Sequence, residues 1–500
     1  MSPDTPPSPQ PRRLDGISDI RRFFYRNEVP TYFISATNFN LLGIDEWVRN
    51  FSYICYIDCF DGQHPNVITP PDKTDRVFTS IEEINNYLLE HKAIVDHIRS
   101  RGPGRAVFLF FDERTEQLCK ELGLELCFPS AKLREAIDDK ISATRIANEA
   151  GVPSVPNTLA KVQDYASLID QAEAADLGTD LVIQTAFGDS GHTTFFIAGE
   201  DDYKKHAEEI EAEDEVKVMR RINNRGGALE ACVTRHGTIV GPLMTELVGF
   251  GELTPYRGGW CGNEVFAGAF SRAIRDRARE ATFKFGEALR ERGYRGYFEC
   301  DYLIDLDSEN VYLGEVNPRI TGASSMTNLA AFAHADAPLF LFHLLEWSKV
   351  DFDLDVRALN RRWSDPDNID GWSQLVIKHT KDSLEYVSAA PASGIWHLGD
   401  DGSVSFVRPQ THRRTARDES NAFFLRITRA GDYFYEGADL GILVTPGRLM
   451  TDDFELTERA KAWIAGIRAQ FSSRPLTDKD PEPPEQVQAR VAELGGFKFL

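Results

Sequence analysis

Two segments in the second half of the chain carry oxygen-rich side chains at the spacing of a strand. Glu315, Asn317 and Arg319 alternate within Glu315-Val316-Asn317-Pro318-Arg319, and Asp301 lies in an earlier segment. Residues two apart on a strand point to the same side, so the three alternating side chains share one face. Mg²⁺ prefers oxygen donors, usually one or two carboxylates completed by phosphate oxygens. The pattern predicts a Mg²⁺ site formed by Asp301, Glu315 and Asn317, with Arg319 beside the phosphates of a nucleotide triphosphate.

These side chains can meet only if the two segments pair as a β-hairpin. Tyr297 to Ile304 and Val311 to Gly314 have the composition of strands, and a polar turn separates them. A hairpin of this length would bring Asp301 beside Glu315. The same short pattern also fits a hairpin with a polar face, on which Glu315 and Arg319 form a surface ion pair. The segments around the hairpin favour the metal site.

The order of these segments resembles that of the ATP-grasp superfamily. Asp139-Lys140 leads into a helix-like run, Ile141 to Ala150, and then into Gly151-Val152-Pro153-Ser154-Val155-Pro156. The superfamily has a similar passage, whose Lys touches the nucleotide phosphates, and its catalytic strand carries Glu-x-Asn-x-Arg after an acidic residue on the neighbouring strand. The resemblance implies ATP and Mg²⁺ (or Mn²⁺) as cofactors, Lys140 as a phosphate contact and Arg319 as the catalytic residue.

A small polar loop between two apolar strands follows this passage. The loop and both strands lie within Asp180 to Ile197. Glycine permits the turn and lets backbone N–H groups approach phosphate oxygens. The resemblance implies that the loop is a flap over the triphosphate and that four of its residues contact ATP: Gly188, Ser190, Gly191 and His192.

Gln184 departs from the superfamily pattern, which usually has Lys, sometimes Arg, at this position. A neutral amide cannot offset phosphate charge. Gln184 is therefore expected to contact the nucleotide without neutralising it. Either Lys140, Arg220 or His192 compensates, or nucleotide affinity is reduced.

The expected contacts to adenine and ribose are assigned from the order of segments along the chain, compared with that in the superfamily. The expected strand Val216 to Ile222 occupies the hinge position of ATP-grasp proteins, so Arg220, Arg221 and Ile222 are carried over as nucleotide contacts. Glu230 resembles the acidic residue that lies near the ribose hydroxyls in the superfamily. It fits equally well a solvent-side Glu on a half-buried strand.

A Gly-rich loop from Gly249 to Glu264 is the candidate substrate loop. Arg257 could clamp a carboxylate and Trp260 could stack on an apolar moiety. A structural loop anchored to the core by its Trp is the alternative. The expected substrates are a small-molecule carboxylate and an amine, such as an amino acid or a peptide-like compound.

The C-terminal segments Phe423 to Ile427 and Gly437 to Leu443 look like those of the biotin-carboxylase branch. That branch continues after its catalytic Arg with Gln-Val-Glu-His, whose Glu acts as a base, whereas Ile320 to Ser325 follow Arg319 here. The chain also lacks a biotin-acceptor motif. The predicted function is therefore an ATP-dependent ligase that activates a carboxylate as an acyl phosphate and joins it to an amine. A bicarbonate-using carboxylase and a nucleotide-binding protein with weakened turnover are the alternatives.

The predicted fold class is α/β and α+β. It comprises an N-terminal Rossmann-like domain of alternating strands and helices, a two-lobed ATP-grasp core and a C-terminal α+β domain. The predicted organisation is a disordered lead (1–14), an N-terminal domain (15–130), an ATP-grasp domain (131–348, with a small flap lobe at about 155–220), a C-terminal domain (349–472) and an extended tail (473–500).

Composition excludes two classes of partner. The formal net charge is −22 and no Lys/Arg-rich run is present, which argues against nucleic acid and anionic membranes. No apolar stretch is long enough to span a bilayer. The seven cysteines form no Cys-x-x-Cys pair, and their odd number fits reduced thiols in a cytoplasmic protein. The resemblance also admits a homodimer, since enzymes of the superfamily are often dimers.

Overall fold

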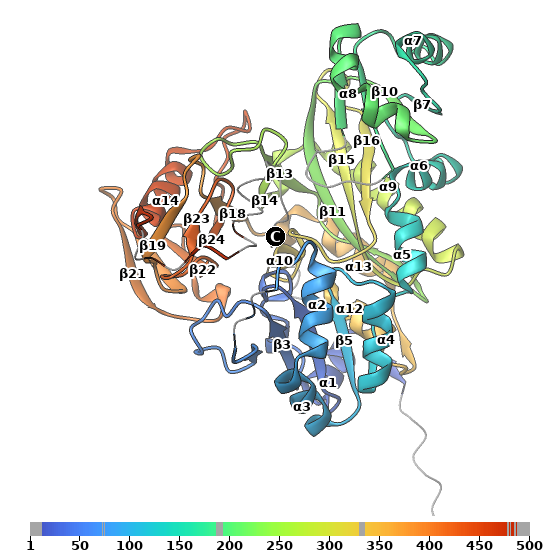
Figure 1. The fold of residues 1–500 in the computed structure, drawn as a ribbon. Coiled ribbons are helices and arrows are strands. Elements are labelled where there is room, and N and C mark those ends of the chain that lie inside the picture. Colours follow the sequence, from blue (N-terminus) through green and yellow to red (C-terminus); the bar gives the residue numbers. More distant parts are fainter. Residues whose placement is uncertain are drawn as a thin grey trace, which may run out of the picture.

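The computed structural model describes residues 13–72, 74, 76–186, 194–329, 336–477, 480, 482–484 and 487. Figure 1 shows three lobes around a central set of strands: the N-terminal part in blue, a small lobe in green and the C-terminal part in orange and red. The expected mixture of α/β and α+β architecture is confirmed.

The N-terminal lobe is a five-stranded parallel sheet, as the alternation of strands and helices predicted. Its strand order is β4-β3-β2-β5-β6. The strands are β2 (Thr31–Ser35), β3 (Phe51–Cys55), β4 (Val67–Ile68), β5 (Gly104–Phe108) and β6 (Leu124–Leu126). The helices are α1 (Ile17–Tyr25), α2 (Ile81–Glu90), α3 (Lys92–Arg101) and α4 (Glu113–Leu122).

The sequence pattern of this lobe predicts helices over residues 44–49 and 81–99, and both predictions are wrong in detail. The segment 44–49 forms only a 3₁₀ turn, Ile44–Glu46, which follows the left-handed Gly43 (φ 95°). The segment 81–99, expected as one helix, is two, because His91 adopts an extended conformation (ψ 124°) between α2 and α3. Both differences arise from single backbone conformations that hydrophobic spacing does not report.

The small lobe is a four-stranded antiparallel sheet of order β7-β10-β8-β9, which follows helices α5 and α6 along the chain. One face buries Ile183 and Val218 against helices α7 and α8, whereas Val182 and Met219 lie on the other face, where Leu303 of the large sheet packs. The elements are α5 (Ala131–Asp138), α6 (Lys140–Glu149), β7 (Asn157–Ala160), α7 (Tyr165–Ala174), β8 (Leu181–Gln184), β9 (Thr194–Ile197), α8 (Glu200–Ala212) and β10 (Val216–Arg220). A cleft-side face and a core face therefore alternate along each strand.

The large sheet contains the predicted hairpin as β15 and β16. The strand order is β16-β15-β11-β13-β14-β18-β24-β22-β20-β21, and β12 pairs with β11. Its first strands are β11 (Asn224–Thr234), β12 (Gly237–Val240), β13 (Met244–Val248), β14 (Trp260–Val265), β15 (Gly296–Asp305) and β16 (Val311–Asn317). Helix α9 (Arg272–Glu291) packs on β11 and β15 through Phe285 and Leu289.

The large sheet continues across the predicted domain boundary at residue 348. Strand β14 pairs with β18, so the C-terminal strands extend the sheet that carries the hairpin. The later elements are α10 (Ser324–Thr327), α12 (Leu339–Glu346), α13 (Val356–Ser364), β18 (Trp372–Lys378), β20 (Gly394–Leu398), β21 (Val404–Pro409), β22 (Asn421–Arg426), β24 (Asp439–Pro446) and α14 (Glu458–Arg468). Two minor sheets pair β1 (Leu14–Asp15) with β17 (Phe352–Asp353), and β23 (Tyr433–Phe434) and β25 (Ser472–Pro475) with β19 (Glu385–Ala389). The proposed domain limits themselves stay a prediction.

All seven cysteines are buried and unpaired. Across the described part of the chain, the search for a helix with the length and apolarity needed to cross a bilayer finds none.

The β14–β18 junction gives a stability prediction. Gly262 has φ 144°, and a Cβ there would lie 2.1 Å from the Gln374 carbonyl oxygen. Gly262→Ala is therefore expected to lower the free energy of unfolding by about 2–3 kcal/mol, seen as a lower denaturant midpoint. Gly251→Ala is the control, because a Cβ there meets no atom within 4 Å. Equal midpoints for the two variants would contradict this account of the junction.

Candidate functional site

The β15–β16 hairpin brings four predicted residues together, and hydrogen bonds link three of them: Asp301, Asn317 and Arg319. Asp301 and Glu315 are direct cross-strand partners. The Asn317 amide nitrogen donates to Asp301 Oδ2 at 2.9 Å, and Asn317 Oδ1 accepts from Arg319 Nη2 at 2.6 Å. The structure therefore places these residues side by side, as predicted. Their role as metal ligands stays a prediction.

Two further carboxylates lie on the same face and were missed in the sequence. Glu299, two residues before Asp301, is buried and accepts from the Asn317 amide nitrogen at 3.3 Å. Glu246 comes from β13. Strand alternation from Asp301 would have found Glu299, whereas Glu246 is far away in sequence and only the sheet brings it near.

The crowding of these acids raises their pKa values. Burial, followed by repulsion from the neighbouring carboxylates, raises the pKa of Glu299 and that of Asp301 well above their usual range. Burial and Glu315 raise the pKa of Glu246 to about 7. Burial raises the pKa of Glu315, and the positive charges of Lys140 and then Arg319 oppose this increase. Negative charge at this face thus exceeds what the nearby cations neutralise.

This donor set fits a hard divalent cation. Carboxylate and amide oxygens are what Mg²⁺ takes from protein, with ligand oxygens filling the rest of its shell. Within the described ranges, no three His, Cys, Asp or Glu side chains form a ready-made metal cluster. Asp301, Glu315 and the Asn317 oxygen would therefore hold the ion only as part of a mixed shell.

Lys140 reaches the same face from the start of α6. Its side chain is 5% exposed, and Nζ lies 3.6 Å from Glu315 Oε2. Asp139 caps the helix by accepting from the N–H groups of Ile141 and Ser142, and the Lys140 N–H donates to the Ala186 carbonyl at 2.9 Å. The predicted phosphate lysine is therefore fixed between the carboxylates and the base of the predicted flap.

The predicted flap contacts Gly188, Ser190, Gly191 and His192 lie outside the described residues. At its base, Gln184 Nε2 donates to Thr194 Oγ1 at 3.3 Å. The Gln184 oxygen is buried and makes no hydrogen bond within the described part of the chain.

The hinge side chains differ from expectation. Arg220 is exposed and donates to the Asp176 carbonyl at 2.6 Å, and it shares its strand parity with the core-facing Val218. Arg221 lies near Asp180 (3.6 Å) and over the exposed Phe196 ring. The Arg220 guanidinium therefore points away from the cleft, and the expectation that Arg220 compensates for Gln184 is not supported. Arg221 lies on the cleft-side face, because Phe196 is the cross-strand partner of Val182.

An apolar patch lies beside the hinge, where the small lobe meets β15 and β16. Val155, Val182 and Met219 are buried together, and Ile222, Leu303 and Tyr312 pack on them. The expected contact of Ile222 with the nucleotide stays a prediction. Alternation along β8 and β10 was the signal that could have found Val182 and Met219.

Glu230 lies deeper than a ribose contact requires. Its side chain is fully buried and accepts hydrogen bonds from the hydroxyls of Tyr297, Thr321, Ser324 and Thr327. Burial raises its pKa to about 7, and these hydroxyls oppose the shift. The geometry indicates that Glu230 holds the loop after Arg319 rather than a sugar.

That loop forms the wall of the candidate substrate space. Trp260 packs against it, since a Cβ on Gly322 would lie 2.3 Å from the indole ring, and the indole N–H donates to Asn263 Oδ1 at 3.1 Å. Arg257 is exposed in the preceding turn, and its side chain makes no hydrogen bond or ion pair with the residues that the structure describes. The structure thus brings Trp260, but not Arg257, to the site.

The N-terminal and C-terminal lobes also hold the site loop. Asn40 donates to the Thr321 carbonyl at 2.8 Å, and buried Arg413 donates to the Ser325 carbonyl at 2.9 Å. The Arg319 guanidinium lies over the Phe110 ring, 4.2 Å from its centroid. The N-terminal and C-terminal lobes therefore both contact Arg319 or the loop that follows it.

Comparison with known proteins shows the fold. No known protein-family profile matches the chain. Over 260 residues, 50% of this chain, it is 23% identical to pyruvate carboxylase from Komagataella pastoris, of which it spans 20%. Biotin carboxylase from Campylobacter jejuni superposes with a TM-score of 0.60 at 13% identity, covering 93% of this chain and 96% of that one. N5-carboxyaminoimidazole synthase from Aspergillus clavatus, solved with ADP and 5-aminoimidazole ribonucleotide, gives 0.53 at 12% identity, with 87% and 97% covered. The ATP-grasp fold implied by the sequence is confirmed.

The crowded carboxylates predict that Mg²⁺ alone stabilises the protein. Saturating Mg²⁺ is expected to raise the thermal midpoint by about 1–3 °C at pH 8. The increase should be smaller at pH 6, because carboxylates with raised pKa values then keep protons that the ion must displace. Thermal scans with Mg²⁺ or EDTA measure both effects.

Asp301→Asn should remove most of this increase. Asp202→Asn is the control, since Asp202 lies on the exposed side of α8 and pairs with Lys205 at 2.8 Å. An Asp301→Asn protein that Mg²⁺ stabilises as much as wild type would contradict the site.

Proposed function

We propose that the chain binds ATP with Mg²⁺ between the small lobe and the β15–β16 hairpin, and uses it to phosphorylate a small-molecule carboxylate. The observation that carries the proposal is the linked set of Arg319, Asn317 and Asp301, with the Glu315–Lys140 ion pair beside it. If the base binds on the apolar patch, its triphosphate would lie beside these oxygen donors and the two cations, Lys140 and Arg319. Phosphoryl transfer depends mainly on such positioning and charge stabilisation.

Each residue has a distinct task in this reaction. Asp301, Glu315 and Asn317 hold the cation, which would supply neutralisation of phosphate charge when bound. Lys140 donates to phosphate oxygens. The Arg319 guanidinium lies over the Phe110 ring and donates to Asn317, and both contacts orient it to stabilise the transferred phosphoryl group. The carboxylate oxygen attacks the γ-phosphorus, and ADP leaves.

The second step joins the resulting acyl phosphate to an amine. The amine nitrogen attacks the acyl carbon, phosphate leaves, and the amine loses a proton. Acyl phosphates hydrolyse, so water has to be kept away. The loop after Arg319, held by Glu230 and covered by Trp260, forms one wall of that space. An amino acid or peptide-like compound is the class of substrate proposed for it.

Bicarbonate is the second candidate for the acid. It is favoured by the fold, because the most similar structures include biotin carboxylase and N5-carboxyaminoimidazole synthase. Against it, the segment after Arg319 has no acidic side chain in place of the base used by biotin carboxylases. The nearby Glu230 is enclosed by hydroxyls and cannot reach a substrate without breaking those hydrogen bonds.

ADP release against a panel of acids separates the candidates. Amino acids, dipeptides, small carboxylic acids and bicarbonate are each supplied with ATP, Mg²⁺ and an amine. Release that depends on an organic carboxylate supports the ligase, and release that depends on bicarbonate alone supports the carboxylase. Binding of nucleotide without release by any acid would leave a nucleotide-binding protein.

Arg319→Ala is expected to reduce acid-dependent ADP release by at least about 10²-fold, because the transition-state charge loses its cation. Glu315→Ala should abolish release through loss of a metal ligand. Coupled-enzyme rates, with circular dichroism to confirm folding, measure both effects.

Arg220→Ala is the matched control for Arg319→Ala, since the Arg220 guanidinium points outward. It should keep the wild-type rate. Full activity of Arg319→Ala, or equal losses in the two arginine variants, would contradict the proposed mechanism.

A further inference from the structure

Lys217 is a buried lysine that the proposed mechanism does not yet use. It lies in the middle of β10 with 1% of its surface exposed. Within the described part of the chain, its ammonium makes no hydrogen bond or ion pair. Lysine is rarely buried without a partner, because a desolvated charge is costly.

The register of the small lobe directs Lys217 toward the nucleotide cleft. Lys217 is the direct cross-strand partner of Gln184, and such partners share a face with Cβ atoms about 4.5–5.5 Å apart. Its neighbours Val216 and Val218 point into the small-lobe core. Lys217 therefore lies on the same face as Met219, which belongs to the apolar patch.

The charges that Lys217 meets come from the metal-site face. Burial lowers its pKa to about 8; Glu315 opposes the shift, and Lys140 adds to it. Glu315 is already paired with Lys140, so it is not available as a dedicated partner. Beside Lys217, the buried Gln184 oxygen also lacks a hydrogen-bond donor within the described residues. Among the residues that the structure describes, these two adjacent polar groups thus have no hydrogen-bond partner.

We propose that Lys217 binds the phosphate groups of the nucleotide, and that it supplies from β10 the positive charge that Gln184 does not supply from β8. The ligand is a nucleoside di- or triphosphate, whose oxygens would accept from the ammonium. This inference rests on the proposed function, since it assigns one more contact in the same nucleotide site. It also replaces the outward-facing Arg220 as the compensating cation.

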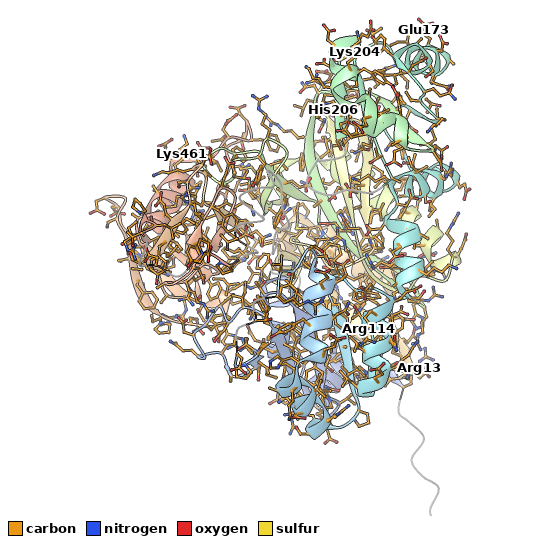
Figure 2. All side chains as sticks on the ribbon, in the orientation of Figure 1. Arg13, Arg114, Glu173, Lys204, His206 and Lys461 are labelled. Carbon is orange, nitrogen blue, oxygen red and sulfur yellow. The ribbon has the colours of Figure 1, made fainter. Side chains whose placement is uncertain are left out.

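Isothermal titration with ATPγS and Mg²⁺ tests the proposal in the full-length protein. Lys217→Met should weaken ATPγS binding at least about tenfold, the loss typical of one charge-assisted hydrogen bond, while adenosine affinity stays unchanged. Lys204→Met is the control. Lys204 lies on α8 at the outer end of the small lobe (Figure 2), where it pairs with Glu200 at 3.0 Å. It should bind ATPγS like wild type.

Exchange of the two side chains gives a second, stricter test. Because Gln184 and Lys217 face each other across the strands, Gln184→Lys combined with Lys217→Gln should recover most of the affinity lost in Lys217→Gln alone. A lysine with a purely structural role would not be replaced in this way. Thermal midpoints without ligand show whether each variant is folded.

The outcomes separate this inference from the proposed function. Failure of the wild type to bind ATPγS would overturn both. Wild-type binding that Lys217→Met leaves intact, or a Lys217→Met loss that is equal for adenosine and ATPγS, would overturn only the role of Lys217. Selective loss with recovery in the exchanged pair would establish it.

Discussion

The burial of four carboxylates on one face of the large sheet constrains the rest of the site. Burial raises the pKa values of Glu246, Glu299, Asp301 and Glu315, and repulsion from neighbouring carboxylates adds to the shift of the first three. Such a face is stable only with protons, side-chain cations or a bound metal ion. Lys140 and Arg319 provide part of the compensation from opposite sides. A divalent cation with its phosphate ligand would complete it, which is why the same residues suit both metal and nucleotide.

The rest of the molecule holds this charged face rigid on one side and leaves the other side open. The hairpin is continuous with a sheet that runs into the C-terminal lobe, while Asn40, Phe110 and Arg413 fix the loop and the arginine that follow it. The small lobe is a separate sheet whose cleft-side face carries the apolar Val182 and Met219 together with the polar Gln184 and Lys217. A base can therefore lie on Met219 and its neighbours while the phosphates reach the polar end.

Sequence reasoning succeeded where the signal was local. The hairpin, its turn and the shared face of Glu315, Asn317 and Arg319 follow from strand alternation, and the position of Lys140 followed from a resemblance in its flanking residues. Contacts between distant strands were not readable in this way. Glu246 reaches the site only through the order of strands in the sheet, and Lys217 opposes Gln184 only in one register of β8 and β10. Arg220 was expected in the cleft from its place in the order of segments, but it has the strand parity of the core-facing Val218 and lies outside the cleft.

The central claim is that oxygen atoms of adjoining strands and of a nucleotide share one divalent cation. Electron paramagnetic resonance of Mn²⁺, with ATPγS carrying ¹⁷O in its phosphates, tests this claim directly. The account predicts one Mn²⁺ per chain, bound more tightly with the nucleotide than without it, and a signal that ¹⁷O in the phosphates broadens. Mn²⁺ that stays free in the presence of bound nucleotide, or a bound signal without ¹⁷O broadening, would contradict it.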